Sequence, residues 1–298
     1  MRLSLALLAA IALPAQNGLF DFDQLPPLEC EPLGQPRRDA VLQGCAFAGP
    51  HGGQINLLLV TPKLAKPPYA GVLFQHGGGQ SMTNYLSEAL ILARAGAVSM
   101  LTDAPPRGQG YISQINQTKL HQAQQLEIDV VVSLRMALCH LLNQKGVDAR
   151  RVAYVGHSYG AMAGSVLAAV EPRFTTFILL GGLPSMVEHM RKNNAPYWEE
   201  MRHNMTAAEF EETLHLLSAT EPSRHLPNAK GPLLIQCARF DTPDNIAGCP
   251  KVHALARGAS QLTWYDDDHY FTSWEAGHDR LRWLARHLSL RVNGAWRK

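Results

Sequence analysis

The sequence predicts an α/β protein in which a mostly parallel β-sheet is covered by helices on both faces. Three observations support this prediction. Short apolar runs alternate with helical stretches along most of the chain, which is typical of a parallel sheet buried between helices. The 298 residues lie within the range of a single large domain. Hydrophobic residues make up 46% of the chain and charged residues 17%, so one sizeable core can form.

The first predicted elements are two strands within residues 41–61, joined as a hairpin by a turn that contains Gly49, Pro50 and Gly52. A Pro-rich lead-in precedes this hairpin. Six more strands are predicted from short apolar runs at residues 70–75, 97–102, 152–156, 175–180, 233–237 and 261–265.

The strongest helical pattern covers residues 120–144, where one face is apolar and can pack on the sheet. Apolar side chains recur there every four residues, at Leu126, Val130, Leu134, Leu138 and Leu142. A last amphipathic helix is predicted over residues 274–290. It is expected to close the domain.

Residues 184–228 differ from the rest because they are rich in Met, His, Trp and charged side chains. Thr206 is followed three residues later by Glu209, which is the pattern of a capping box at the start of a helix. We interpret the segment as a helical insertion between two strands of one domain that covers residues 21–298. It forms either a small cap over one end of the sheet or an ordinary covering helix with a long approach.

The N-terminal residues have the features of a secretion signal. Met1 and Arg2 give a short positive start, and residues 3–13 form an apolar run that is too short to span a bilayer. Small residues follow, so residues 1–20 are predicted to be a signal peptide; an ordinary N-terminal core helix is the alternative. The protein is then expected to be secreted or periplasmic, without a membrane anchor.

Export would place the five cysteines in an oxidising compartment. Their spacing favours two local disulfides, Cys30–Cys45 and Cys237–Cys249. Cys139 is left over inside an apolar helical pattern, where it is interpreted as a small buried side chain rather than a reactive thiol. Five free cysteines are the alternative.

Several classes of partner are not expected from the sequence. The formal net charge of +2 gives no basic excess of the kind that nucleic-acid binding needs. No compact set of His or Cys ligands indicates a metal site. The glycine run after residue 75 lacks the later glycine spacing of a dinucleotide-binding turn, so no dinucleotide cofactor is expected.

The pattern with the most chemical content is Gly156-His157-Ser158-Tyr159-Gly160, which fits Gly-x-Ser-x-Gly. A predicted strand ends just before it and a helical pattern begins just after it. In that context the pattern forms a sharp turn that exposes a nucleophilic serine. Ser158 is therefore the predicted nucleophile, and a Gly-Ser turn without a chemical role is the alternative.

A second glycine-rich turn, His76-Gly77-Gly78-Gly79, follows the strand predicted at residues 70–75. Glycines let a backbone N–H come close to a substrate carbonyl. Together with the N–H of Tyr159, the N–H of Gly78 is predicted to form an oxyanion hole, and Gly79 is the second choice. A plain glycine turn after a strand is the alternative.

A serine hydroxyl needs a base to take its proton and a carboxylate to orient that base. Asp241 follows the strand at residues 233–237, and His269 follows the strand at 261–265. The order Ser, Asp, His is the order this arrangement requires, so the three form the predicted catalytic triad. Asp244 is the reserve acid. His157, beside the serine, is expected to shape the pocket.

These residues resemble those of the α/β-hydrolase superfamily, specifically its dienelactone hydrolase and acyl-peptidase-like branch, over roughly residues 40–290. Residues 103–110 are similar to the Asp-x-Arg-Gly-x-Gly turn of that branch, and residues 221–226 resemble the segment before its penultimate strand. The resemblance implies an eight-stranded sheet and hydrolysis of esters or related acyl groups without a cofactor. Two departures are Ala238 and Arg239, where a glycine is commoner, and the absence of the cysteine nucleophile of dienelactone hydrolases.

The predicted function is that of a serine hydrolase that cleaves small-molecule carboxylic esters through an acyl-enzyme. Ser158 attacks the carbonyl, His269 acts as general base and Asp241 orients the imidazole. A serine peptidase or amidase is the first alternative. A non-catalytic hydrolase-like binding protein is an alternative from a different class. No motif indicates the acyl group, the alcohol or the oligomeric state.

Overall fold

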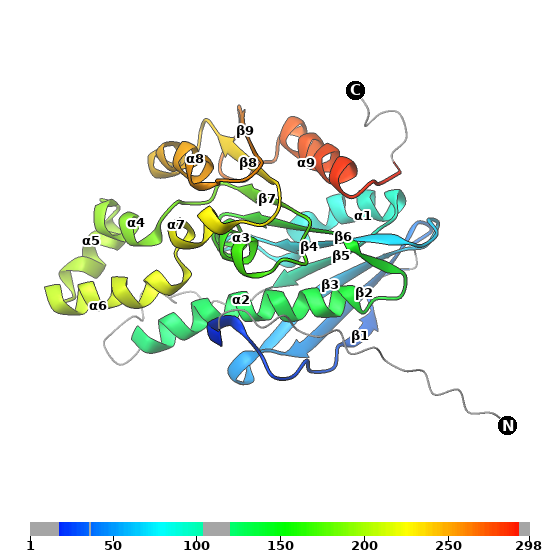
Figure 1. The fold of residues 1–298 in the computed structure, drawn as a ribbon, viewed down its shortest axis with the longest axis horizontal. Coiled ribbons are helices and arrows are strands. Elements are labelled where there is room, and N and C mark those ends of the chain that lie inside the picture. Colours follow the sequence, from blue (N-terminus) through cyan, green and yellow to red (C-terminus); the bar gives the residue numbers. More distant parts are fainter. Residues whose placement is uncertain (1–17, 36, 104–119, 292–298) are drawn as a thin grey trace.

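The computed structural model describes residues 18–35, 37–103 and 120–291. Within these residues the strands form one nine-stranded sheet in the order β1-β2-β3-β5-β4-β6-β7-β8-β9 (Figure 1). Along this order, neighbours pair antiparallel from β1 to β5 and parallel from β5 to β9. The strands are β1 (Glu29–Pro32), β2 (Ala40–Ala48), β3 (Gln54–Pro62), β4 (Tyr69–Gln75), β5 (Ala97–Asp103), β6 (Val147–His157), β7 (Thr176–Leu180), β8 (Leu233–Ala238) and β9 (Ser260–Tyr265).

Helices cover both faces of the sheet, so the parallel strands are apolar on both sides. Successive side chains of β4 show this, since Leu73 joins one core cluster whereas Val72 and Phe74 join the other. The predicted α/β architecture is confirmed. The helices are α1 (Leu86–Ala95), α2 (Leu120–Leu142), α3 (Tyr159–Val170), α4 (Met186–Lys192), α5 (Pro196–His203), α6 (Ala207–Leu217), α7 (Pro222–His225), α8 (Pro243–Leu255) and α9 (Trp274–His287).

The predicted hairpin and the six further strands are all present, but the number of strands differs from the expected one. The resemblance implied eight strands, whereas the described residues contain nine because β1 lies within the Pro-rich lead-in. β1 pairs antiparallel with β2 at the edge of the sheet, and Cys30 lies opposite Cys45 in the register. Its side chains are mostly exposed, so it has no apolar pattern to reveal it.

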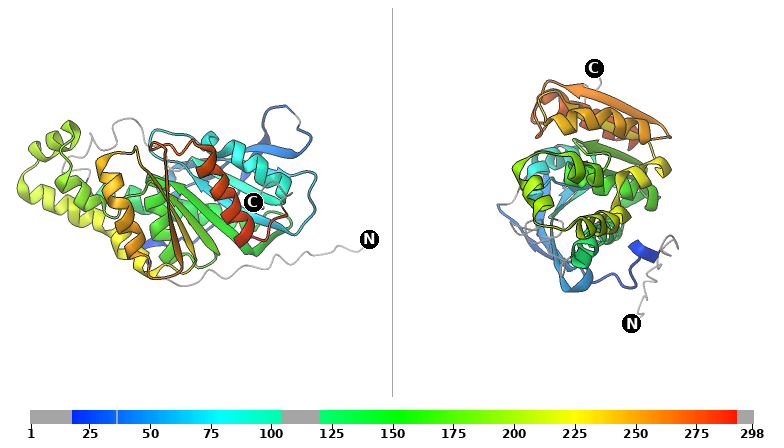
Figure 2. Two further views of the ribbon diagram at one scale, coloured as in Figure 1. Left: turned by 90° about the horizontal axis from the view of Figure 1, so that it is seen from above. Right: turned by 90° about the vertical axis from the view of Figure 1, so that its left-hand side faces the viewer.

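The segment between β7 and β8 contains four α-helices, α4 to α7, and two short 3₁₀ helices, η5 (Ser218–Thr220) and η6 (Leu226–Asn228). The expected capping box is present at Thr206 and Glu209, where α6 begins. Met190, Met201 and Leu214 form a small separate core among α4, α5 and α6. Figure 2 shows that these three helices extend beyond one end of the sheet.

The folded part of the described chain begins earlier than the predicted signal boundary. Residues 18–20 were assigned to the signal peptide, but they form the 3₁₀ helix η1 (Gly18–Phe20). Phe20 is only 1% exposed, and its carbonyl accepts a hydrogen bond from buried Arg135. A chain cleaved after residue 20 would lack this contact, and the boundary at residue 20 stays a prediction. The remaining residues of the predicted signal, 1–17, lie outside the described part.

Both predicted disulfides are confirmed, Cys30–Cys45 and Cys237–Cys249. Cys139 is free and half-buried, and its sulfur lies 3.2 Å from Nη1 of Arg173, so it is less enclosed than expected. Among the described helices, none is both long enough and apolar enough to cross a membrane. Residues 104–110 of the turn that resembles Asp-x-Arg-Gly-x-Gly lie outside the described residues.

Candidate active site

The predicted site residues lie at one edge of the sheet, because each follows the carboxyl end of a parallel strand. Gly78 follows β4, Ser158 follows β6, Asp241 follows β8 and His269 follows β9. The strands are parallel, so these four ends point the same way. Open α/β sheets place their functional residues at this edge.

Ser158 sits on a sharp turn between β6 and α3. Its φ of 51° and ψ of −108° place the backbone in a region that few non-glycine residues occupy. The turn is packed so closely that a Cβ on Gly156 would lie 2.3 Å from the carbonyl oxygen of Gly160. The backbone N–H of Ser158 donates to the carbonyl of Leu180 on the neighbouring strand at 2.7 Å. The serine side chain is consequently held at the positive end of the α3 dipole.

The structure brings Ser158, His269 and Asp241 together. Nε2 of His269 lies 3.0 Å from Oγ of Ser158, and Nδ1 of His269 lies 2.8 Å from Oδ2 of Asp241. The Asp241 side chain is 2% exposed and that of His269 is 30% exposed. Because the carboxylate can only accept, Nδ1 carries the proton and Nε2 is left as the acceptor that faces the serine hydroxyl.

Asp241 is held in its ionised form by donors from its own loop. Oδ1 accepts hydrogen bonds from the backbone N–H of Thr242 at 2.6 Å and from Nδ2 of Asn245 at 2.8 Å. Burial raises the pKa of Asp241, but the hydrogen bonds from His269, Asn245 and Thr242 outweigh it and leave the pKa below its ordinary value. Sequence reasoning missed Asn245. The Thr-Pro start of α8, which places Asn245 in the first helical turn, is the signal that marks it.

Asp244, the reserve acid, serves a different contact. Its Oδ2 accepts a hydrogen bond from Nδ2 of Asn193 at 2.5 Å and lies 3.0 Å from Nδ1 of His189. Asp244 therefore ties the start of α8 to α4, while Asp241 faces the imidazole of His269.

The glycine turn after β4 packs directly against the serine. A Cβ on Gly77 would lie 3.0 Å from Cβ of Ser158, and the Gly77 N–H donates to Oε1 of Gln80 at 2.9 Å. His76 connects this turn to β5. Its Nε2 lies 2.7 Å from Oδ1 of Asp103, and its Nδ1 lies 2.7 Å from the Gly77 carbonyl oxygen. Gly78 is exposed beyond it, and a Cβ there would meet nothing within 4 Å.

His157 is not among the residues that line the cavity described below. Its ring is 2% exposed and lies between two loops. Nδ1 is 2.7 Å from Oε1 of Gln80, and Nε2 is 2.6 Å from the carbonyl oxygen of His269. Burial, together with the neighbouring His269, lowers the pKa of His157 to about 4. Sequence reasoning gave no indication of Gln80, which follows the glycine run without a pattern of its own.

A model of the prolyl oligopeptidase family matches residues 85–284, about two thirds of the chain. The chain belongs to the prolyl oligopeptidase family. This membership places it in the acyl-peptidase-like branch of α/β-hydrolases, as the resemblance implied. No curated protein matches the sequence.

Solved structures share the fold of this prolyl oligopeptidase family member. An acetyl xylan esterase from a Paenibacillus species has 19% identity and a TM-score of 0.75, over 89% of this chain and 90% of that one. Acetyl xylan esterase 1 from a Thermoanaerobacterium species has 16% identity and a TM-score of 0.74, over 88% of each chain. An acylaminoacyl peptidase from Pyrococcus horikoshii has 11% identity and a TM-score of 0.63, over 85% of this chain but 41% of that one.

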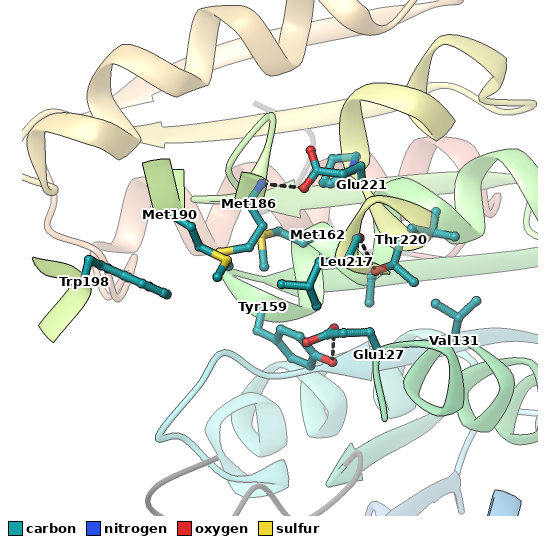
Figure 3. Close-up of a pocket in the computed structure, with 13 residues that line it drawn as sticks. Glu127, Val131, Tyr159, Met162, Met186, Met190, Trp198, Leu217, Thr220 and Glu221 are labelled. Carbon is teal, nitrogen blue, oxygen red and sulfur yellow. Dashed lines mark hydrogen bonds between the residues drawn. The ribbon is translucent and has the colours of Figure 1, made fainter. Parts of the chain in front are cut away.

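In this family member, a cavity of about 50 Å³ lies beside the nucleophile turn, between α2, α3 and the helices that follow β7 (Figure 3). The ring of Tyr159, the residue after Ser158, forms part of its wall, and the Tyr159 hydroxyl donates to Glu127 at 3.0 Å. On the opposite side, Glu221 accepts the backbone N–H groups of Met186 and Val187 at 2.8 and 2.9 Å and so fixes the start of α4. The other walls are mainly apolar: Val131, Met162, Ala163, Val166, Met186, Met190, Trp198, Leu217, Thr220 and Pro222.

Within the described part of the chain, no group of three or more His, Cys, Asp or Glu side chains is arranged to hold a metal ion.

Proposed function

We propose that this chain is a serine hydrolase that cleaves carboxylic esters, with Ser158, His269 and Asp241 as its catalytic triad. The observation that carries the proposal is the pair of contacts made by one imidazole, 3.0 Å to Oγ of Ser158 and 2.8 Å to buried Asp241. An imidazole in this position can accept the serine proton at one nitrogen while the carboxylate stabilises the charge that develops on the ring.

In the first half of the proposed reaction, Oγ of Ser158 attacks the ester carbonyl carbon and its proton passes to Nε2 of His269. The carbonyl oxygen becomes an oxyanion, which the N–H groups of Gly78 and Tyr159 stabilise. When the C–O bond to the alcohol breaks, the leaving oxygen takes the proton from Nε2. An acyl-enzyme on Ser158 and a free alcohol result.

In the second half, a water molecule attacks the acyl carbonyl while Nε2 of His269 takes one of its protons. Collapse of this second tetrahedral intermediate returns that proton to Oγ of Ser158 and releases the carboxylic acid. Asp241 remains ionised throughout, which agrees with the lowered pKa of its carboxyl group.

The cavity beside Tyr159 favours a small apolar group of the ester as its ligand. Its walls are mainly apolar, and its volume of about 50 Å³ suits a short group. Two structures of similar fold are acetyl xylan esterases, so acetyl esters are the first substrates to test. We further propose that α4 to α6 form a cap over this cavity, and that the protein is exported, which its two disulfides support.

Peptide or amide hydrolysis is the second candidate, because the chain belongs to the prolyl oligopeptidase family. The chain spans 41% of the acylaminoacyl peptidase whose fold it shares. An enzyme that is primarily an esterase should show a higher kcat/KM for an acetyl aryl ester than for an N-acyl amino acid anilide. The reverse order would favour the peptidase.

Replacing Ser158 with alanine tests the proposal directly. Ser158→Ala should lower kcat/KM on both substrates by at least about 10⁴-fold, because the nucleophile is lost. It should also stop covalent labelling by a fluorophosphonate. Ser87→Ala, at an exposed serine on α1, is the matched control and should behave like the parent protein. Parent-level turnover or labelling in Ser158→Ala would overturn the proposal, and an unlabelled parent protein would indicate a non-catalytic binding protein.

A further inference from the structure

Building on the proposed function, we propose that His157 is a positioning residue that joins the turn after β4, which carries the Gly78 N–H, to the loop after β9, which carries His269. His157 directly precedes the proposed nucleophile, Ser158, in the sequence. The His157 side chain makes no hydrogen bond to the serine hydroxyl or to Asp241, and it acts through the Gln80 side chain and the His269 carbonyl.

A continuous chain of polar contacts runs around Ser158 through the His157 ring. The Gly77 N–H donates to Oε1 of Gln80 at 2.9 Å, and the same oxygen lies 2.7 Å from Nδ1 of His157. On the other side of the ring, Nε2 lies 2.6 Å from the carbonyl oxygen of His269. The turn after β4 and the loop after β9 are thus connected to each other by one side chain of the nucleophile turn.

The ring has no room to move. Its centroid lies 4.9 Å from that of the His269 ring and 5.9 Å from that of Phe271. A Cβ on Gly77 would come within 2.7 Å of Nδ1. A displacement of the His157 ring would therefore be passed on to the base, to the glycine turn or to both, because close-packed interiors transmit strain.

The His157 ring has one proton for two contacts, so its contacts with Gln80 and with His269 depend on each other. With a pKa of about 4, His157 is neutral at neutral pH and carries a single N–H. Both ring nitrogens face oxygen atoms, so the proton serves either Gln80 or the His269 carbonyl. A change of tautomer shifts the stronger hydrogen bond from one loop to the other. Each loop is therefore sensitive to the contact made by the other.

Three substitutions separate the two connections. His157→Phe keeps a ring of similar shape and removes both polar contacts. His157→Asn places an amide near the position of Nδ1 and keeps the Gln80 side, whereas His157→Gln reaches the position of Nε2 and keeps the His269 side. We expect His157→Phe to lower kcat on the acetyl ester by about 10- to 100-fold, because small misplacements of catalytic groups have effects of this size. KM should stay within about twofold.

His157→Gln should recover part of the lost kcat, because it restores a donor to the His269 carbonyl. His287→Phe, at the far end of α9, is the matched control and should leave kcat unchanged. Melting temperatures of all four variants are measured alongside the kinetics.

The proposal is overturned if His157→Phe keeps a kcat within twofold of the parent protein, or if Phe, Asn and Gln variants lose kcat equally and in proportion to their melting temperatures. Ser158→Ala, assayed in the same series, keeps this result separate from the proposed function. If Ser158→Ala is inactive and His157→Phe is fully active, only the positioning role is ruled out. If Ser158→Ala is active, the proposed function itself is ruled out.

Discussion

The backbone at Ser158 depends on glycines that leave no space for a side chain. A Cβ on Gly160 would lie 2.4 Å from the carbonyl oxygen of Gln75, and one on Gly164 would lie 2.5 Å from the ring of Tyr154. Real Cβ atoms do not approach backbone oxygens this closely, so β4, β6 and α3 would have to separate. The close approach of these three elements is what holds the serine in its unusual backbone geometry.

Gly160→Ala should therefore destabilise the protein and disturb the nucleophile turn. We expect the free energy of unfolding to fall by about 2–3 kcal/mol or more, since overpacking a rigid site costs this much. Urea unfolding measures the change, and fluorophosphonate labelling of the residual folded protein reports on Ser158. Gly44→Ala on β2 is the control, because a Cβ there meets nothing within 4 Å. Equal stability of the two variants would contradict the packing argument.

Candidate site residues were predictable from the sequence when a strand led directly to them. Ser158, Asp241 and His269 each follow an apolar run, and a parallel sheet places the ends of these runs at the same edge. Gln80 and Asn245 were not predictable, because their contacts depend on how a loop or a first helical turn bends. The path of the chain through such segments is set by packing against other loops, which no local pattern records.

Among the elements, the loop that carries Asp241 is held by a covalent bond of its own. The Cys237–Cys249 disulfide joins the end of β8 to α8, and Asp241 lies within the segment that it closes. Asp241 also depends on Thr242 and Asn245, which belong to the same segment. Loosening this segment should affect the orientation of His269 as well as the stability of the fold.

Replacing Cys237 and Cys249 together by serine should lower both stability and kcat. The expected loss in the free energy of unfolding is about 2–3 kcal/mol for a loop of this length. The matched control replaces Cys30 and Cys45 by serine. The disulfide that this control removes ties edge strand β1 to β2, far from Asp241. That control should lose stability while its kcat stays at the parent value. Equal kcat in the two double variants would show that the disulfide does not position the acid.

Helices and strands were predictable where burial of one or both faces creates an apolar pattern in the sequence. The interior strands are apolar on both faces and were all predicted, whereas β1 is exposed and was missed. β6 begins at Val147 rather than at residue 152, because Val147 pairs with Tyr69 before a register shift. Of the helices between β7 and β8, only the start of α6 was predicted individually, from the capping box at Thr206.

At the scale of the whole molecule, buried ionisable groups connect distant parts of the chain. Arg135 of α2 is 1% exposed and pairs with fully buried Glu171 at 3.2 Å. The same guanidinium donates to the Phe20 carbonyl and to Asp21 of the N-terminal segment. Two histidines differ from this arrangement because they are buried without a carboxylate contact. His157 lies in the candidate site, and His140 packs against Phe47, with its Nε2 lacking a hydrogen-bond partner among the described residues.

These two histidines should make the folded state less stable in mild acid. Burial lowers the pKa of His140 to about 4, and His157 has the same value. An unfolded histidine titrates near 6.5, so between that pH and about 4 the unfolded chain binds protons that the folded protein does not. The free energy of unfolding must then fall as the pH falls through this window. Each histidine should contribute about 2 kcal/mol of the loss between pH 7 and pH 5.

His140→Phe isolates one of these contributions without touching the site, because it keeps a ring against Phe47 and removes the titrating nitrogen. Urea unfolding at pH 8, where an unfolded histidine is also neutral, sets the baseline difference between the variant and the parent protein. At pH 5 the variant should gain about 2 kcal/mol relative to that baseline, because only the parent protein still has His140 to protonate on unfolding. A baseline difference that stays constant from pH 8 to pH 5 would mean that the His140 ring already accepts a proton in the folded state, which its burial beside Phe47 opposes.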